Sequence, residues 1–263
     1  MPILKDLSEA ALADAVEASQ VEWIRTQGRL PWVQWHDEGD VVRVFAGDTW
    51  PRNMVGQARF TPESVHRRVG EILAAHLQHK VACDWVVGPA SQPANLSQAL
   101  KTHGFSCRIH CAGMACDLEA RREKPGPPPG VAIREGDEPA KIYPLTTQRR
   151  RALHDGLTLA GKVRPRSIWH FSAQVDGKAV GRSMLLLGAG VAGIYGVGVM
   201  ENYQRKGIGT SLVQAALERA AKLGFKAAVL GATGMGQGVY QRLGFREVCK
   251  LSFWKYGKMR QLD

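Results

Sequence analysis

The sequence lacks an apolar run long enough to cross a bilayer, because runs such as 184–187 and 227–230 end after a few residues. A membrane-spanning helix needs about 20 predominantly apolar residues. The N-terminal segment mixes Lys5, Asp6 and Glu9 with its apolar residues, so the apolar core of a secretion signal cannot be drawn there. We therefore expect a cytoplasmic protein with neither a membrane span nor a secretion signal.

Cysteine is scarce and unevenly spaced, and an odd set of five is not the pattern of a disulfide framework. Cys107, His110, Cys111 and Cys116 form the one group that suggests a metal site, but structural zinc sites usually pair closely spaced cysteines twice. Strand alternation would place Cys107 and Cys111 on one face and His110 on the other. We expect these to be buried small side chains and no metal to be bound.

Two common nucleotide-binding motifs are also missing. No Gly-Lys-Ser/Thr sequence is present, which excludes a Walker A loop. Leu212 stands where the dinucleotide fingerprint has its third glycine after Gly207 and Gly209. A phosphate group bound at these glycines would therefore belong to another cofactor.

Acidic residues are outnumbered, since 24 Asp and Glu stand against 35 Lys and Arg, for a formal net charge of +11. Such an excess favours a polyanionic partner, which can be a nucleic acid, a membrane surface or a phosphorylated cofactor. No RNA-binding or helix-turn-helix signature is present, so a nucleic-acid-binding protein is the weaker alternative.

The length of 263 residues is sufficient for two domains. Residues 119–130 combine charged residues with a proline run that neither a helix nor a central strand tolerates. We therefore expect an N-terminal domain over 1–118, a linker over 119–130 and a C-terminal domain over 131–263.

The C-terminal half predicts strands and helices in the order βββαβαβ. Asp176-Gly177 joins two apolar runs and is a strong hairpin signal. Apolar residues at helical spacing then continue to Gly224, a residue type that commonly ends helices. The expected strands are 168–175, 178–187, 191–199, 226–230 and 247–254. One helix is expected from about 210 to 223, and a second, short helix is expected to end at 243.

The N-terminal half shows a weaker copy of the end of this order. Thr61 and Pro62 predict a helix start. A strand follows at 81–87, and a short helix ends before Gly104-Phe105. The matching pair is Gly244-Phe245, so the halves are offset by 140 residues. We interpret this as a degenerate internal repeat.

The most distinctive local segment is 204–210, Gln-Arg-Lys-Gly-Ile-Gly-Thr, between an expected strand and an expected helix. Unpaired N–H groups at a helix start carry the positive end of its dipole and can bind a phosphate. Gly207 and Gly209 would let phosphate oxygens approach the main chain, and Arg205 and Lys206 would add charge. The alternative is an ordinary loop whose glycines only satisfy backbone geometry.

These residues resemble the GNAT superfamily of acyl-coenzyme A dependent N-acetyltransferases. The family signature, Gln/Arg-x-x-Gly-x-Gly/Ala, is matched by Gln204, Gly207 and Gly209, and a helix tyrosine before Leu-Gly-Phe is matched by Tyr240. The resemblance covers about residues 131–256. It implies an α/β fold with two GNAT-like domains, each a mixed, mostly antiparallel β-sheet flanked by helices, in a tandem arrangement whose N-terminal unit is degenerate.

The resemblance also implies acetyl-CoA as cosubstrate and a role for each matched residue. The strand end at 197–199 would bind the pantetheine arm, and the 204–210 loop would hold the pyrophosphate. Tyr240 would protonate the departing thiolate as general acid, the alternative being a tyrosine that only packs on the sheet. Thr233 stands where family members often carry Asn. The expected cofactor-binding residues are Val197, Gly198, Val199, Gln204, Arg205, Lys206, Gly207, Ile208, Gly209, Thr210, Thr233 and Tyr240.

The general base is left open by the sequence, with Glu201, His154, Asp155 and His170 as candidates and a water chain as the alternative. The N-terminal segment 58–63 has no glycine pair, so we expect that half not to catalyse.

The acceptor is expected to be recognised by loops such as 150–167 and by the N-terminal half. The arginines of 149–151, with Arg164 and Arg166, would rim the acceptor site or be solvated. The Trp residues of the N-terminal half, among them Trp23, would form its core or face the cleft between domains.

The expected reaction transfers an acetyl group to a primary amine of a small molecule, such as an amine-bearing metabolite or antibiotic. A peptide or protein N-terminus or lysine is the alternative acceptor. A coenzyme A-binding sensor without turnover is the remaining alternative. The sequence does not indicate an oligomeric state.

Overall fold

The computed structural model describes residues 2–47, 53–120 and 126–257. Residues 121–125 of the expected linker therefore lie outside the described residues. No helix of the described part is both long and apolar enough to cross a membrane.

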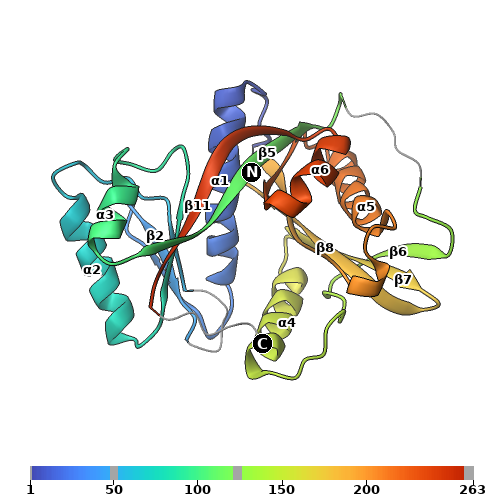
Figure 1. Cartoon of the computed structure of the whole chain (residues 1–263), viewed down its shortest axis with the longest axis horizontal. Helices are drawn as coiled ribbons and strands as arrows, with labels where there is room; N and C mark the ends of the chain where they lie inside the picture. The colour runs from blue at the N-terminus through green and yellow to red at the C-terminus, as the bar shows by residue number, and fades with distance from the viewer. Residues whose placement is uncertain (1, 48–52, 121–125, 258–263) are drawn as a thin grey trace.

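The described strands form one continuous sheet (Figure 1). They are β1 (Gln34–Asp37), β2 (Val42–Phe45), β3 (Met54–Gly56), β4 (Cys83–Val87), β5 (Ser106–Asp117), β6 (Val131–Gly136), β7 (Ile168–Val175), β8 (Lys178–Gly188), β9 (Val191–Val199), β10 (Ala227–Ala232) and β11 (Arg246–Tyr256). Their spatial order is β1-β2-β3-β4-β11-β5-β10-β9-β8-β7-β6. The β3–β4 and β9–β10 pairs are parallel, whereas the neighbouring pairs around them are antiparallel. The expected α/β fold with a mixed, mostly antiparallel sheet is confirmed.

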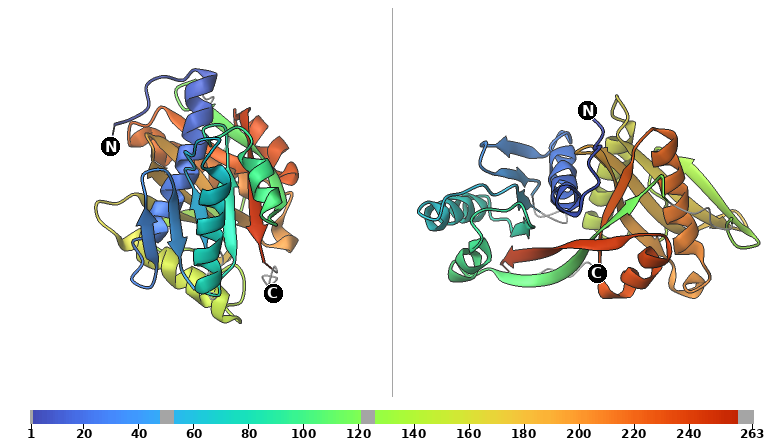
Figure 2. Two further views of the ribbon diagram at one scale, coloured as in Figure 1. Left: turned by 90° about the vertical axis from the view of Figure 1, so that its left-hand side faces the viewer. Right: turned by 90° about the horizontal axis from the view of Figure 1, so that it is seen from above.

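The two halves of the chain share this sheet by exchanging their last strands. β5 ends the N-terminal half, yet it lies between β10 and β11 of the C-terminal half. β11 in turn pairs with β4 of the N-terminal half. Figure 2 shows both long strands running between the halves. Local sequence patterns predict strands but not their partners, which is why this exchange was not expected.

Helices cover both faces of the sheet. They are α1 (Glu9–Gln27), α2 (Val65–Gln78), α3 (Leu96–Thr102), α4 (Gln148–Lys162), α5 (Ile208–Lys222) and α6 (Gly234–Arg242), with a short 3-10 helix, η1, at Glu201–Tyr203. Ser183 of β8 donates a hydrogen bond to Leu212 O of α5, whereas the next residue, Met184, packs with Ala160 of α4 and Trp23 of α1. Since successive strand residues point to opposite faces, α5 lies on one face and α1 with α4 on the other.

The N-terminal helix α1 stands at the centre of the molecule, between the helices of the two halves (Figure 1). The Ser8 hydroxyl caps it by accepting from Ala11 N at 3.4 Å. Its buried residues include Leu12, Val16 and Ile24 but also polar ones such as Glu17. Because α1 touches strands of both halves, its apolar residues do not form the single stripe that marks a surface helix.

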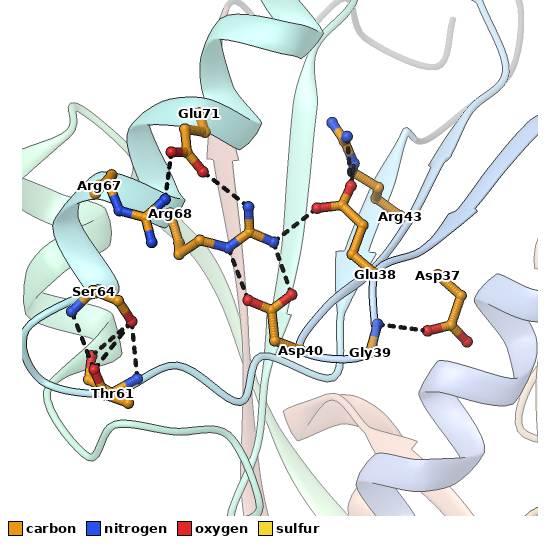
Figure 3. A network of polar contacts seen from close by, with 10 residues as sticks. All are labelled: Asp37, Glu38, Gly39, Asp40, Arg43, Thr61, Ser64, Arg67, Arg68 and Glu71. Carbon is orange, nitrogen blue, oxygen red and sulfur yellow. Dashed lines mark hydrogen bonds and ion pairs between the residues drawn. The ribbon is translucent and has the colours of Figure 1, made fainter.

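Two expectations for helices were wrong. Most of the segment 150–167, expected as a loop, belongs to α4, which begins where the Thr147 hydroxyl accepts from Arg150 N at 3.2 Å. The helix expected to start at Thr61 starts at Val65 instead. There the Thr61 and Ser64 hydroxyls bond each other at 3.2 Å and form a turn before the helix (Figure 3).

Candidate active site

The strands β9 and β10 separate toward their carboxyl ends. They pair at Ala192↔Ala228 and Gly193↔Val229 and at no later position of the described strands. β9 continues to Val199, and its residues from Tyr195 onward are partly exposed. The two strands therefore separate after these pairs, and within the described residues 197–199 of β9 have no ladder partner in β10; we call this separation the opening between β9 and β10.

The loop after β9 leads into α5 with an uncapped, glycine-lined start. Gly207 is the N-cap residue, adopts a left-handed φ of 79°, and no side chain caps the helix. Gln204 bridges back to the strand by donating to Val199 O at 3.1 Å. A Cβ on Gly209 would meet only Val199, at 3.8 Å, so the main chain is approachable. The first-turn N–H groups are thus available to an anion, and the exposed Arg205 and Lys206 lie beside them.

α6 begins at the carboxyl end of β10 and presents Tyr240. The Tyr240 ring packs edge-on against Phe245 with centroids 6.0 Å apart, and burial raises the pKa of its phenol. Thr233 is the N-cap residue of α6 but makes no side-chain capping bond. Since β9 and β10 are parallel, the 204–210 loop and the start of α6 lie at the same edge of the sheet.

A pocket of about 340 Å³ lies between the two halves, on the face of the sheet that α1 and α4 cover and opposite the face that α5 covers. α1 contributes Trp23, and β9 contributes Gly196, which has a positive φ of 59° where the β8–β9 register shifts. The pocket thus reaches β9 next to the opening. Its lining comprises Gln20, Trp23, Gln27, Met54, Pro139, Leu153, Leu157, His170, Arg182, Ser183, Met184, Tyr195, Gly196 and Phe253.

Of the four base candidates, His170 lines this pocket. Its Nε2 lies 3.2 Å from Leu157 O, and burial lowers its pKa to about 4. His154 is buried with an unpartnered Nδ1, and burial also lowers its pKa. Asp155 and Glu201 are exposed, and neither lines the pocket.

Of the arginines considered for the rim of the acceptor site, those with described side chains do not line this pocket. Arg151 donates to Leu145 O at 2.9 Å and Arg166 pairs with Asp137 at 2.9 Å, so they tie α4 and β7 to the 137–146 segment. The side chain of Arg149 lies outside the described residues.

The expected separation of Cys107 from His110 was wrong, because Cys107 Sγ lies 3.3 Å from His110 Nε2. The β5–β11 register shifts between Ile109 and Cys107, which breaks the alternation of side chains. Within the described residues, no group of three or more His, Cys, Asp or Glu side chains is placed to hold a metal ion.

Among its described residues, the N-terminal half has no comparable opening. After β3 and β4, Gln92 N donates to Ala58 O at 2.9 Å and Phe60 N to Gln92 O at 3.3 Å, so the two segments stay bonded. Glu17 of α1 accepts from Ala90 N at 2.6 Å in the loop after β4. At the repeat offset of 140 residues, Leu100 replaces Tyr240 and is fully buried.

Sequence reasoning missed Arg182, the charged residue of the pocket between the halves. No sequence motif marks this residue, because its place in the pocket depends on the strand register and on packing by α1, which is distant in the sequence. No motif marks Trp23 either, although a position facing the cleft was among the expectations for the N-terminal Trp residues, and Trp23 does line this pocket.

Residues 131–245 match the family model described as acetyltransferase (GNAT) family. No curated protein matches the chain. Similar solved structures include a GCN5-related N-acetyltransferase from Kribbella flavida, with 18% identity, a TM-score of 0.67 and coverage of 92% of this chain and 96% of that one. A tandem GNAT protein from the clavulanic acid biosynthesis pathway has 16% identity, a TM-score of 0.62 and coverage of 98% of both chains.

A GCN5-related N-acetyltransferase from Sphaerobacter thermophilus has 18% identity, a TM-score of 0.60 and coverage of 94% of this chain and 91% of that one. These likenesses extend over both halves and agree with the family match in the C-terminal half. Residues 131–245 therefore belong to the GNAT family of acetyltransferases.

Proposed function

We propose that the protein is an acetyl-CoA dependent N-acetyltransferase that acts on a primary amine of a small molecule. The observation that carries this proposal is the uncapped start of α5 at left-handed Gly207, directly beside the opening between β9 and β10. The opening fits an extended pantetheine arm, and the loop fits a pyrophosphate.

The cofactor is held mainly by main chain in this proposal. Peptide groups of 197–199 bond the amides of the pantetheine arm. N–H groups of 207–210 bond the pyrophosphate at the positive end of the helix dipole, while Arg205 and Lys206 add charge at the rim. Thr233 offers its hydroxyl to the arm from the start of α6.

Transfer then needs one bond to form and one to break. The amine nitrogen attacks the thioester carbonyl, the C–N bond forms, and the C–S bond breaks. Tyr240 gives its proton to the departing thiolate, and its raised pKa keeps the phenol protonated at neutral pH.

The amine proton leaves to water rather than to a histidine. A general base works best with a pKa near the working pH, and the pKa of His170 is held at about 4 by burial. His170 is therefore a neutral ring at pH 7, and its Nε2–H donates to Leu157 O.

The pocket between the halves is the acceptor site in this proposal. Its volume of about 340 Å³ and its mostly apolar walls suit a small molecule better than a peptide chain. Its walls come from both halves, so the domain over 131–263 would catalyse while the domain over 1–118 completes the acceptor site without turnover.

The test is transfer of labelled acetyl from acetyl-CoA to a panel of small primary amines, followed by mass spectrometry of the products. Acetylated amine with matching release of coenzyme A thiol supports the proposal. Saturable coenzyme A binding without any product would indicate a sensor, and product found only on peptides would indicate the alternative acceptor class.

A further inference from the structure

The pocket between the halves contains a charged group that the transfer chemistry does not use. Arg182 lies on β8 opposite Gly198 of β9, and its half-buried side chain lines the pocket. Its guanidinium forms neither a hydrogen bond nor an ion pair with any of the described residues.

Other arginines of the C-terminal half contrast with this one. Arg166 pairs with Asp137 at 2.9 Å, and Arg219 pairs with Glu135 at 2.7 Å. A partly buried guanidinium without a partner is costly, because it has lost water and gained no opposite charge. Such a group is expected where a ligand supplies the missing partner.

The surroundings of Arg182 do not neutralise it. Desolvation lowers its pKa, and the neighbour that opposes this effect is the phenol of Tyr143. In the same pocket His170 is neutral, since its pKa is about 4. The Tyr195 hydroxyl bonds the Ser19 hydroxyl at 2.8 Å, and burial raises its pKa, so it is neutral too.

We propose that Arg182 binds the carboxylate of an acceptor that carries its amine and its carboxylate close together, as an amino acid does. This inference rests on the proposed function, in which the pocket receives the acceptor. A carboxylate matches a single guanidinium in charge and can accept both of its parallel N–H bonds. A phosphate dianion would bring a second negative charge for which the described lining offers no cation.

The rest of the pocket fits an apolar side chain. Most of its wall is apolar, although Gln20 and Gln27 of α1 also reach it. The apolar side chains are those of Trp23, Leu153, Leu157, Met184 and Phe253. Arg182 faces Gly198 across the strands, and Gly196 reaches the same pocket. A carboxylate bound to Arg182 would therefore lie close to β9, where the acyl group is expected. The amine that attacks this acyl group must then be joined to the carboxylate by only a short chain of atoms. Amino acids with apolar side chains are the predicted class.

The experiment compares phenylalanine and leucine with their amides, which keep the amine but lose the negative charge. For the parent protein, kcat/KM should be on the order of 10- to 100-fold higher for the free acids. In Arg182→Gln the value for the acids should fall to that for the amides, while the value for the amides stays unchanged. Arg182→Lys should keep part of the preference, and Arg134→Gln, on the exposed edge strand β6, should keep all of it.

Coenzyme A affinity and the thermal midpoint of each variant establish that it is folded, and Arg182→Lys serves if Arg182→Gln does not fold. Equal turnover of acids and amides by the parent protein, or an equal loss for both in an Arg182 variant, overturns the carboxylate site but leaves acetyl transfer intact. Calorimetry of phenylalanine binding with coenzyme A present gives a second readout. Binding that depends on Arg182 without any acetylation would support the site and contradict the proposed transfer.

Discussion

Trp254 of β11 stands opposite Trp85 of β4 in the antiparallel register, so the last strand of the chain completes the sheet of the first half. Both side chains are buried in one apolar cluster with Phe105. β5 makes the reciprocal exchange, pairing Ala115 with Val229 of β10. The two halves are therefore joined by main-chain hydrogen bonds as well as by side-chain packing.

The exchange predicts that residues 131–263 expressed alone do not fold stably. Without β5, the facing edges of β10 and β11 lose their ladder partner, and without α1 the opposite face loses its cover. The measurement is thermal unfolding by circular dichroism with coenzyme A titration. The matched control is both halves coexpressed as separate chains divided within 119–130, which should assemble and bind coenzyme A. A cooperative transition and normal coenzyme A binding from 131–263 alone would refute the prediction.

Tyr240→Phe should lower kcat on the order of 10²-fold while coenzyme A affinity stays nearly unchanged. The ring still packs against Phe245, and only the proton donor is lost. Because burial raises the pKa of Tyr240 above its ordinary value of 10.0, any alkaline limb that it causes lies above pH 10 and should disappear in the variant. Tyr256→Phe, at the end of β11 where the ring packs against the apolar cluster of the N-terminal half, is the control and should leave kcat unchanged. An unaltered kcat in Tyr240→Phe, with chemistry rate-limiting, would show that the thiolate leaves unassisted.

Arg68→Ala should destabilise the protein by about 1–3 kcal/mol. Arg68 joins α2 to the 38–40 turn with bonds of 2.8 and 2.7 Å to Asp40 and 2.7 Å to Glu38 (Figure 3). The guanidinium side chain is only 15% exposed, so these partners are not readily replaced by water. Arg67→Ala is the matched control, because Arg67 is 65% exposed and pairs with Glu71 alone; its loss should stay below about 0.5 kcal/mol. Equal urea midpoints for the two variants would contradict this account.

Stability should fall as the pH drops from about 6.5 toward 4. Burial lowers the pKa of His76 and of His170 to about 4, from an ordinary value of 6.5. Between these values the unfolded chain binds protons that the folded chain excludes, so unfolding becomes more favourable with acid. For the parent protein, the free energy of unfolding measured in urea should decrease from pH 7 to pH 5. In His76→Phe this decrease should be smaller by about 1–2 kcal/mol. His66→Gln, an exposed histidine on α2, should leave the loss as it is, and an unchanged loss in His76→Phe would disprove the assignment.

The C-terminal half was largely predictable from local signals. Asp176 and Gly177 have positive φ values of 48° and 74°, as the expected hairpin turn requires, and Gly224 follows α5 with a φ of 84°. The helix and loop around Gly207 were predictable for the same reason, since glycine tolerates the left-handed backbone. What escaped prediction depends on partners far away in the sequence. The burial of α1, the strand exchange and the isolation of Arg182 all arise from contacts between the halves, which no local pattern records.

The central claim is that the loop at Gly207 holds the pyrophosphate of coenzyme A, and calorimetric titration of coenzyme A into Gly207→Val tests it most directly. The parent protein should bind saturably, and the variant should lose binding because a branched side chain occupies the approach to the α5 N–H groups. Gly177→Val is the matched control, since Gly177 has a similar φ of 74° in an open hairpin turn, so the variant bears similar backbone strain away from the loop. The account predicts normal coenzyme A binding by Gly177→Val and none by folded Gly207→Val. Parent-like binding by folded Gly207→Val would contradict it.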